Sequence, residues 1–224
     1  MADHATLIDA LSAEAGPVRR VSPAWVRALF WAPLALGLGY LATNLVHRAS
    51  TDWADPLAFV AAANIVVSLT LGVAAFIAAL SVSIPGGRVR GKGWIAGGVA
   101  AWLALAVFSI SLSGDPRGVL GEGSYCFTFV VTAGLPMVLV GILALRRTRS
   151  LKPVRSLTLA GMGSAFFSFG LLAFCHPVEL SAMDFTAHIV AGMLLGGVAV
   201  LLGRRIIALG AGQGRPSETV FNLP

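Results

Sequence analysis

The chain has 224 residues, of which 57% are hydrophobic and only 12% are charged, and its mean hydropathy is +0.84. A soluble domain carries about 25% charged residues, so this composition excludes an ordinary soluble protein and indicates an integral membrane protein. The net charge of +6 at pH 7 does not require a nucleic-acid partner, because membrane proteins gather Lys and Arg in their cytoplasmic loops.

The first 27 residues form a polar leader in front of the first apolar run. Leu7, Ile8 and Leu11 fall on one face of a short amphipathic helix. Asp3 is its candidate N-cap, and Gly16-Pro17 ends it. Two interpretations remain open: the helix lies on the inner membrane surface, or its apolar stripe enters a groove on a partner protein. No small-residue cleavage site ends the first apolar run, so we expect the first span to be retained.

Six apolar runs follow, each at least ~18 residues long and so able to cross a bilayer as a helix. A backbone in lipid must satisfy its own hydrogen bonds, which favours helices, and the alternation typical of a β-barrel is absent. The predicted fold is an all-α bundle of six transmembrane helices over residues 28–205, followed by a flexible tail over residues 206–224. The predicted spans are residues 28–46, 57–84, 94–113, 126–145, 157–175 and 184–203.

Lys and Arg are distributed unevenly between the predicted loops. If the N-terminus is cytoplasmic, all of them except Arg48 and Arg117 lie in cytoplasmic segments. This asymmetry predicts that both termini are cytoplasmic. The loops are about 8–13 residues long, which leaves no room for a soluble catalytic domain.

The interiors of the predicted spans carry few polar groups. No Asp, Glu, Lys or Arg lies near the middle of a span, whereas ion-coupled transporters bury such groups on their pathway. Asn64, Ser68 and Thr70 form hydrogen bonds between helices or, alternatively, line a substrate path. A small-molecule transporter or channel is therefore the second hypothesis. The segment GMLLG (192–196) predicts close helix packing within the chain, with homodimerisation as the alternative.

Two cysteines flank the fourth and fifth predicted spans. Cys126 opens the fourth span and Cys175 closes the fifth, and each helix rises about 30 Å. Both side chains are therefore expected at the same height, at the outer interface. Three interpretations are open: a structural disulfide or two free thiols, a redox- or metal-responsive pair, or a thiol oxidoreductase. The last would need a second cysteine pair or a quinone site to pass electrons on, and the chain has no second pair.

Potential metal ligands accompany the cysteines in the outer loops. Asp184 and His188 share one helix face by their i,i+4 spacing, and thiolate and imidazole suit soft or borderline divalent metals. No standard zinc spacing is present, so ordinary hydrogen bonding is the alternative for both histidines. The candidate cofactor is therefore a transiently bound divalent heavy metal. Its candidate ligands are Cys126, Cys175, His176, Asp184 and His188.

Three features together resemble the NrsF-type six-span membrane anti-sigma factors of proteobacteria. They are the leader LIDALSAEAGPVRR (7–20), the six spans with short loops, and the cysteines in SYCF (124–127) and FCHP (174–177). The resemblance implies a non-enzymatic regulator in the bacterial inner membrane that binds an extracytoplasmic-function sigma factor and has no direct contact with nucleic acid. It also implies release of that sigma factor under stress from redox-active heavy metals such as chromate and cadmium.

The resemblance also implies roles for particular residues. Cys126 and Cys175 correspond to the paired periplasmic cysteines required for sensing. The leader is the candidate surface for sigma-factor contact, and His176 has no counterpart in the family pattern. The leader residues expected to make this contact are Leu7, Ile8, Leu11, Arg19 and Arg20.

Overall fold

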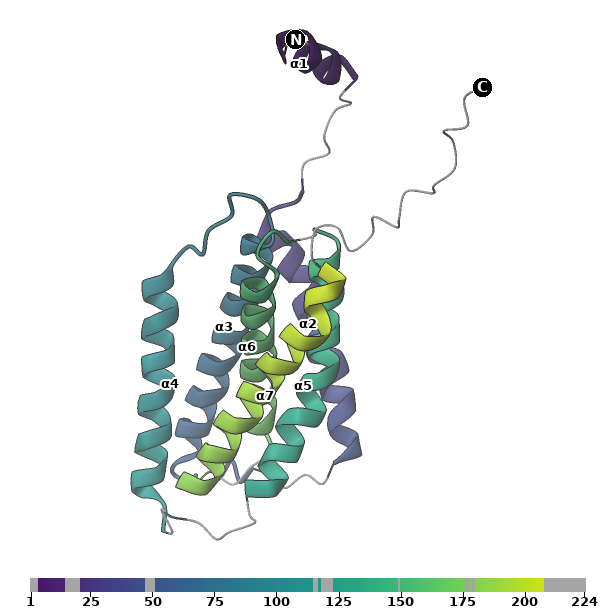
Figure 1. The fold of residues 1–224 in the computed structure, drawn as a ribbon. Coiled ribbons are helices and arrows are strands. Elements are labelled where there is room, and N and C mark those ends of the chain that lie inside the picture. Colours follow the sequence, from purple (N-terminus) through teal and green to yellow (C-terminus); the bar gives the residue numbers. More distant parts are fainter. Residues whose placement is uncertain are drawn as a thin grey trace.

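The computed structural model describes residues 4–14, 21–46, 51–114, 117, 123–148, 150–175, 178 and 180–207. This described part contains seven α-helices and one short 3-10 helix. Six of the α-helices form a bundle, and α1 lies apart from it (Figure 1). The elements are α1 (His4–Glu14), α2 (Ala24–Ala42), η1 (Thr43–Leu45), α3 (Ala58–Val82), α4 (Lys92–Leu112), α5 (Gly123–Arg146), α6 (Pro153–Leu172) and α7 (Ala182–Ile207).

Each of the six predicted spans corresponds to one helix of the bundle, so the all-helical fold is confirmed. The largest differences at the start of a span are four residues, in α6, which begins at Pro153 rather than at residue 157, and in α2, which begins at Ala24 rather than at residue 28. Arg27 lies within its first turn because the guanidinium has a partner there: Nη2 donates a hydrogen bond of 2.6 Å to the carbonyl oxygen of Leu80. That carbonyl lies at the C-terminal end of α3, where a cation is favoured.

Five of the described helices are long and apolar enough to cross a membrane, namely α2, α3, α4, α5 and α7. The remaining predicted span, residues 157–175, falls in α6, which does not reach the same hydropathy. This helix carries Gly and Ser at positions that are buried inside the bundle, including Gly161, Gly163, Ser164 and Ser168. Small residues that face other helices rather than lipid lower hydropathy without exposing polar groups to lipid. The chain is a multi-pass membrane protein with five candidate spans among its described residues.

Helix α6 occupies the middle of the bundle and packs against α3, α5 and α7. Glycines set the closest approaches. A Cβ atom added to Gly161 would lie 2.7 Å from Cα of Gly196 on α7, and one added to Gly192 would lie 3.0 Å from the ring of Phe169 on α6. The segment GMLLG therefore packs within the chain, and the fully buried ring of Phe167 fills the space beside Gly72 of α3.

The polar residues of α3 form bonds within that helix. The hydroxyl of Ser68 donates to Oδ1 of Asn64 at 3.0 Å, and the hydroxyl of Thr70 donates to the carbonyl oxygen of Val66 at 2.7 Å. The expectation that these groups link different helices was wrong. A hydroxyl one turn after an acceptor satisfies its donor locally, without a partner helix.

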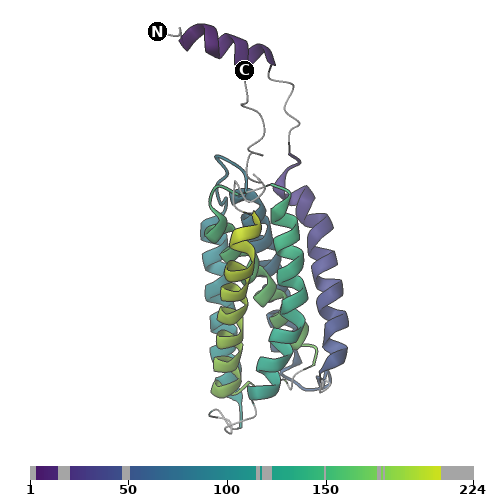
Figure 2. The same cartoon turned by 45° about the vertical axis from the view of Figure 1, so that its right-hand side comes forward.

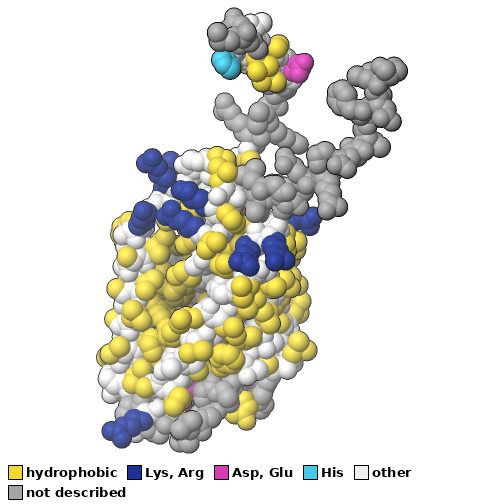
Figure 3. Space-filling model, in the orientation of Figure 1, with side chains coloured by type: hydrophobic (Ala, Val, Ile, Leu, Met, Phe, Trp, Pro, Cys, Tyr) yellow, Lys and Arg dark blue, Asp and Glu magenta, His cyan; other side chains and the backbone are white. Residues whose placement is uncertain are grey.

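The six helices alternate in direction, so α2 begins and α7 ends at the same end of the bundle (Figures 1 and 2). We call this the basic end, because the described Lys and Arg residues, with the exception of Arg117, lie in or beside the helix ends that meet there. Lys and Arg side chains gather at this end on the face that Figure 3 shows. Asp52, Asp55 and Asp184 lie at the opposite end, which we call the acidic end. The predicted boundaries at residues 27 and 205 remain predictions, and residues 208–224 of the tail are outside the described residues.

Candidate functional site

The first turns of α5 and α7 meet at the acidic end. Cys126 of α5 donates its thiol hydrogen to Oδ1 of Asp184 on α7, with a sulfur–oxygen distance of 3.5 Å. The other carboxylate oxygen, Oδ2, accepts a 2.7 Å hydrogen bond from the hydroxyl of Ser181. All three side chains are buried, with exposed fractions of 6%, 9% and 7%. A buried carboxylate is stable when its oxygens are bonded in this way.

The same carboxylate also organises the start of α7. The backbone N–H of Asp184 donates to Oγ of Ser181 at 3.1 Å, and the backbone N–H of Ser181 donates to Oδ2 of Asp184 at 3.4 Å. These reciprocal bonds form a capping box, which satisfies amide groups that a helix start leaves unpaired. Asp184 therefore has two roles: Oδ2 caps α7, and Oδ1 joins α7 to the thiol of α5.

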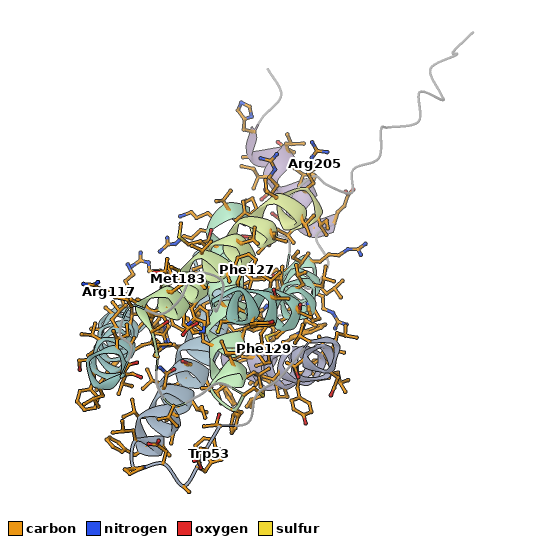
Figure 4. All side chains as sticks on the ribbon, turned by 90° about the horizontal axis from the view of Figure 1, so that it is seen from below. Trp53, Arg117, Phe127, Phe129, Met183 and Arg205 are labelled. Atoms are coloured by element: carbon orange, nitrogen blue, oxygen red, sulfur yellow. The ribbon has the colours of Figure 1, made fainter. Side chains whose placement is uncertain are left out.

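Cys175 follows the end of α6, and its environment differs from that of Cys126. Its side chain is partly exposed and lines a hollow of about 380 Å³ with Tyr40, Thr43 and Phe129. Phe129 lies one turn after Cys126 on α5, so both cysteines adjoin the same end of that helix. Figure 4 views this end, with Phe129 among the helices and Trp53 at the edge.

The loop between α2 and α3 covers the segment around Cys175. The hydroxyl of Thr51 donates to the carbonyl oxygen of Ala173 at 3.0 Å, and the rings of Trp53 and Phe174 lie 6.0 Å apart. On the far side of Cys175, the hydroxyl of Ser109 on α4 donates to the carbonyl oxygen of Val178 at 3.3 Å. The residues before and after Cys175 are thus anchored to different parts of the bundle.

The structure brings the predicted ligands together only in part. Cys126 and Cys175 are not joined in a disulfide. Cys126 contacts Asp184, and His188 lies one turn after Asp184 as expected. Among the described residues, no three His, Cys, Asp or Glu side chains gather closely enough to bind one metal ion. His176 lies outside the described residues, so the predicted metal site with this residue as a ligand stays a prediction.

His188 belongs to an aromatic cluster between α4, α6 and α7. Its ring lies 5.8 Å from that of Phe169 in an edge-on arrangement. Phe169 in turn stacks on Trp102 of α4 at 5.3 Å, and Trp102 also contacts Phe166 and Phe185. Aromatic pairs at these separations add stability beyond the area that they bury. The cluster therefore fixes α4 to α6 and α7 close to both cysteine-bearing helix ends.

A cavity of about 60 Å³ adjoins this cluster. Its polar lining includes Asn64, Trp102, Ser109 and His188, and its walls are otherwise apolar. The indole N–H of Trp102 is buried without a hydrogen-bond partner among the described residues. Asn64, the residue named for the transporter hypothesis, thus lines a small cavity at the junction of α3, α4, α6 and α7.

Helix α7 connects the acidic end to the basic end. It has 26 residues and hence a length of about 39 Å. Its last residue, Ile207, is fully buried and accepts a 2.9 Å hydrogen bond from the backbone N–H of Ser150 in the loop between α5 and α6. A displacement of the start of α7 along its axis would therefore reach this loop.

Helix α1 carries the predicted contact residues of the leader. Leu7, Ile8 and Leu11 are 54%, 61% and 59% exposed, and no residue of α1 is buried. Exposed apolar side chains on one helix face form a surface suited to a partner groove or to a membrane. Arg19 and Arg20 lie outside the described residues.

Two functional contacts escaped the sequence interpretation. Ser181 was not singled out, although SAMD (181–184) before an apolar run is a capping-box signal. The bond between Cys126 and Asp184 spans 58 positions of the chain. No local pattern indicates such a contact, because it depends on how α5 and α7 pack.

Comparison with known proteins identifies a family that this chain matches. The family profile described as "NrsF: Negative regulator of sigma F" matches residues 11–208. The chain is similar to the anti-sigma-F factor NrsF of Caulobacter vibrioides (strain NA1000 / CB15N), with 31% identity over 215 residues that cover 86% of this chain and 94% of that protein. No solved structure matches the chain.

Proposed function

The chain belongs to the NrsF family of negative regulators of sigma F, and we propose that cysteines at its acidic end control the release of its sigma factor. Family membership makes it an anti-sigma factor of the NrsF type, a regulator rather than an enzyme. The proposal extends to an extracytoplasmic-function sigma factor as the partner and to redox or heavy-metal stress as the signal.

The proposed topology places the basic end in the cytoplasm of the bacterial inner membrane. The gathering of Lys and Arg at that end supports this orientation. The alternating helix directions support α6 as a sixth span, which would put both termini on the cytoplasmic side. The acidic end, with Cys126 and Cys175, would then face the periplasm, where thiols are readily oxidised.

The proposed contact with the sigma factor lies on the leader. Leu7, Ile8 and Leu11 present an exposed apolar stripe on α1, at the end of the bundle that the proposed topology places in the cytoplasm. An amphipathic helix of this kind binds by inserting its apolar face into a groove of the partner. Arg19 and Arg20 would extend this contact toward the membrane.

The sensing chemistry acts on the thiol proton of Cys126. Joining the sulfur atoms of Cys126 and Cys175 releases two protons and transfers two electrons to an external oxidant such as chromate. Binding of a thiophilic divalent metal such as cadmium releases the proton without electron transfer. In either case Cys126 can no longer donate to Asp184, because its hydrogen is gone.

The consequence is a change at the start of α7. Once the donor is lost, the buried carboxylate of Asp184 loses the hydrogen bond from Cys126, and the loss of a hydrogen bond to a buried charged acceptor is costly. A shift of the capped turn relieves this cost, and α7 carries the shift to Ser150 at the basic end through Ile207. Two packings of α7 with a small energy difference would then correspond to the bound and released sigma factor.

The observation that carries this proposal is the hydrogen bond between Cys126 and Asp184. The experiment that tests it measures sigma-factor binding to the purified full chain in nanodiscs, before and after oxidation. We expect oxidation to weaken binding at least tenfold in the natural chain and to leave Cys126→Ser unaffected. Equal weakening in both would show that the signal enters elsewhere.

A further inference from the structure

A groove opens at the basic end between α2 and α4, with α3 as its floor. It has a volume of about 800 Å³. Ala74 and Ile77 of α3 form part of the floor, and Trp25 of α2 and Trp94 of α4 form the walls. Arg88 and Arg90, from the loop between α3 and α4, lie at its mouth and are exposed. We call this the basic groove.

The groove exists because two helices pack on a third without meeting each other. Within the described bundle, α2 and α4 both pack against α3, and no extensive contact between α2 and α4 closes the gap. The loop above it turns at Gly86 and Gly91, whose φ angles are +75° and +69°. Side-chain-bearing residues rarely adopt these values, so the glycines shape the mouth.

The walls are apolar and strongly exposed, which requires an occupant in the membrane. Trp94 is 89% exposed and Trp25 is 59% exposed. Tryptophan is enriched where the bilayer meets water, with its ring among the headgroups. An apolar groove at this depth is filled by an acyl chain or by protein, because an empty one forfeits contacts along its whole length.

The mouth of the groove is positively charged and favours an anionic ligand. Arg88, Arg90 and Lys92 occur within five residues that contain no acid. The N-cap of α4, Gly91, has no side chain to bond the first amide groups, so the positive end of the helix adds to the field. On the α6 side of the loop, a second hollow of about 350 Å³ is bounded by Lys92 and Arg155.

We propose that the basic groove binds an anionic phospholipid, with an acyl chain along α3 between Trp25 and Trp94 and the phosphate at Arg88 and Arg90. Basic pockets between transmembrane helices recognise lipid headgroups in this way. The inference goes beyond sigma-factor regulation, since it requires only that the bundle lies in a membrane. In this proposal Arg88 and Arg90 of the loop between α3 and α4 bind a lipid phosphate. The competing occupant of the groove is an acidic segment of a protein partner.

The test uses the full chain in phosphatidylcholine bilayers that contain a small fraction of brominated lipid. Bromine atoms near the headgroup end of the acyl chains quench nearby tryptophans, and Trp25 and Trp94 line the groove. Brominated phosphatidylglycerol is expected to quench the protein at a several-fold lower mole fraction than brominated phosphatidylcholine. Equal quenching by the two lipids would overturn the proposal.

Two variants locate the effect. Arg88→Gln with Arg90→Gln is expected to lower the preference for the anionic lipid about tenfold. Arg204→Gln with Arg205→Gln removes the same charge from the same end but from residues outside the groove, and is expected to keep the preference. Equal loss in both pairs would indicate general surface attraction and overturn the assigned site.

A third variant tests the floor without a change of charge. Ala74→Phe fills part of the groove and is expected to reduce quenching by the anionic lipid, with helix content unchanged by circular dichroism. A protein occupant would give another result: Arg88→Gln with Arg90→Gln would weaken sigma-factor binding and leave the lipid preference intact. That outcome would replace the lipid by an acidic protein segment.

Discussion

Cys126 on α5 and Asp184 on α7 are joined by a 3.5 Å hydrogen bond from thiol to carboxylate. The acceptor is the carboxylate that also caps α7 through Ser181. The chemical state of one cysteine is therefore coupled to the start of a helix about 39 Å long.

Asp184→Ala is expected to destabilise the bundle by about 1–2 kcal/mol, because α7 loses its cap and Cys126 loses its acceptor. Thermal unfolding in detergent measures the effect. Thr186→Val is the control, since the exposed Thr186 hydroxyl bonds only within α7, and its midpoint is expected to stay within the error of the natural chain. A loss of the same size in both variants would contradict the role of Asp184.

Gly161→Ala is expected to destabilise the contact between α6 and α7 by about 1–3 kcal/mol, because the new methyl group would lie 2.7 Å from the backbone of Gly196. Gly197→Ala is the matched control. It lies on α7 in open space and is expected to be neutral or slightly stabilising. Thermal unfolding of both variants measures the difference. Identical unfolding midpoints would show that α6 and α7 are not tightly packed at Gly161.

Replacing Leu7, Ile8 and Leu11 by Ser is expected to weaken sigma-factor binding at least tenfold and to leave the thermal stability of the bundle unchanged, because no residue of α1 is buried. Thr6→Gln with Ala13→Gln changes the opposite face of the same helix and is expected to bind normally. Calorimetry with the cognate sigma factor measures both. Normal binding by the Ser variant would exclude the stripe as the contact.

The topology is tested by labelling single cysteines placed in a chain without Cys126 and Cys175. If α6 is a sixth span, Thr6→Cys and Arg205→Cys react with a membrane-impermeant maleimide only after the cytoplasmic face is opened, whereas Asp52→Cys reacts in intact spheroplasts. With an odd number of spans, Thr6→Cys and Arg205→Cys would lie on opposite sides of the membrane, so only one of them would react in intact spheroplasts. This pattern would contradict the proposed orientation.

Long apolar runs predicted the helices well. The run 57–84 became α3 (Ala58–Val82) and the run 94–113 became α4 (Lys92–Leu112), because a backbone in lipid has no alternative to helical hydrogen bonds. Hydropathy was less decisive for α6, whose buried small and hydroxyl-bearing residues lower its apolar content. A helix buried inside a bundle tolerates small and hydroxyl-bearing residues, whereas a helix exposed to lipid needs apolar ones. The sequence alone does not show which of the two environments a helix such as α6 occupies.

The candidate site was predicted only in part. The positions of Cys126 and Cys175 at one end of the bundle followed from helix length, and the i,i+4 relation of Asp184 and His188 followed from helix geometry. The cross-helix partners did not, because the rotation of α5 against α7 is set by packing. Cys126 consequently has Asp184 as its hydrogen-bond acceptor, whereas the sequence drew attention to Cys175.

The most direct test of the account is sigma-dependent transcription in cells exposed to chromate or cadmium, with the natural chain compared with Cys126→Ser combined with Cys175→Ser. Both chains are expected to repress transcription equally before stress, because neither change touches α1. Under stress, the natural chain is expected to release its sigma factor and induce the promoter, while the double variant keeps it repressed. Normal induction in cells with the double variant would contradict the claim that these cysteines control release.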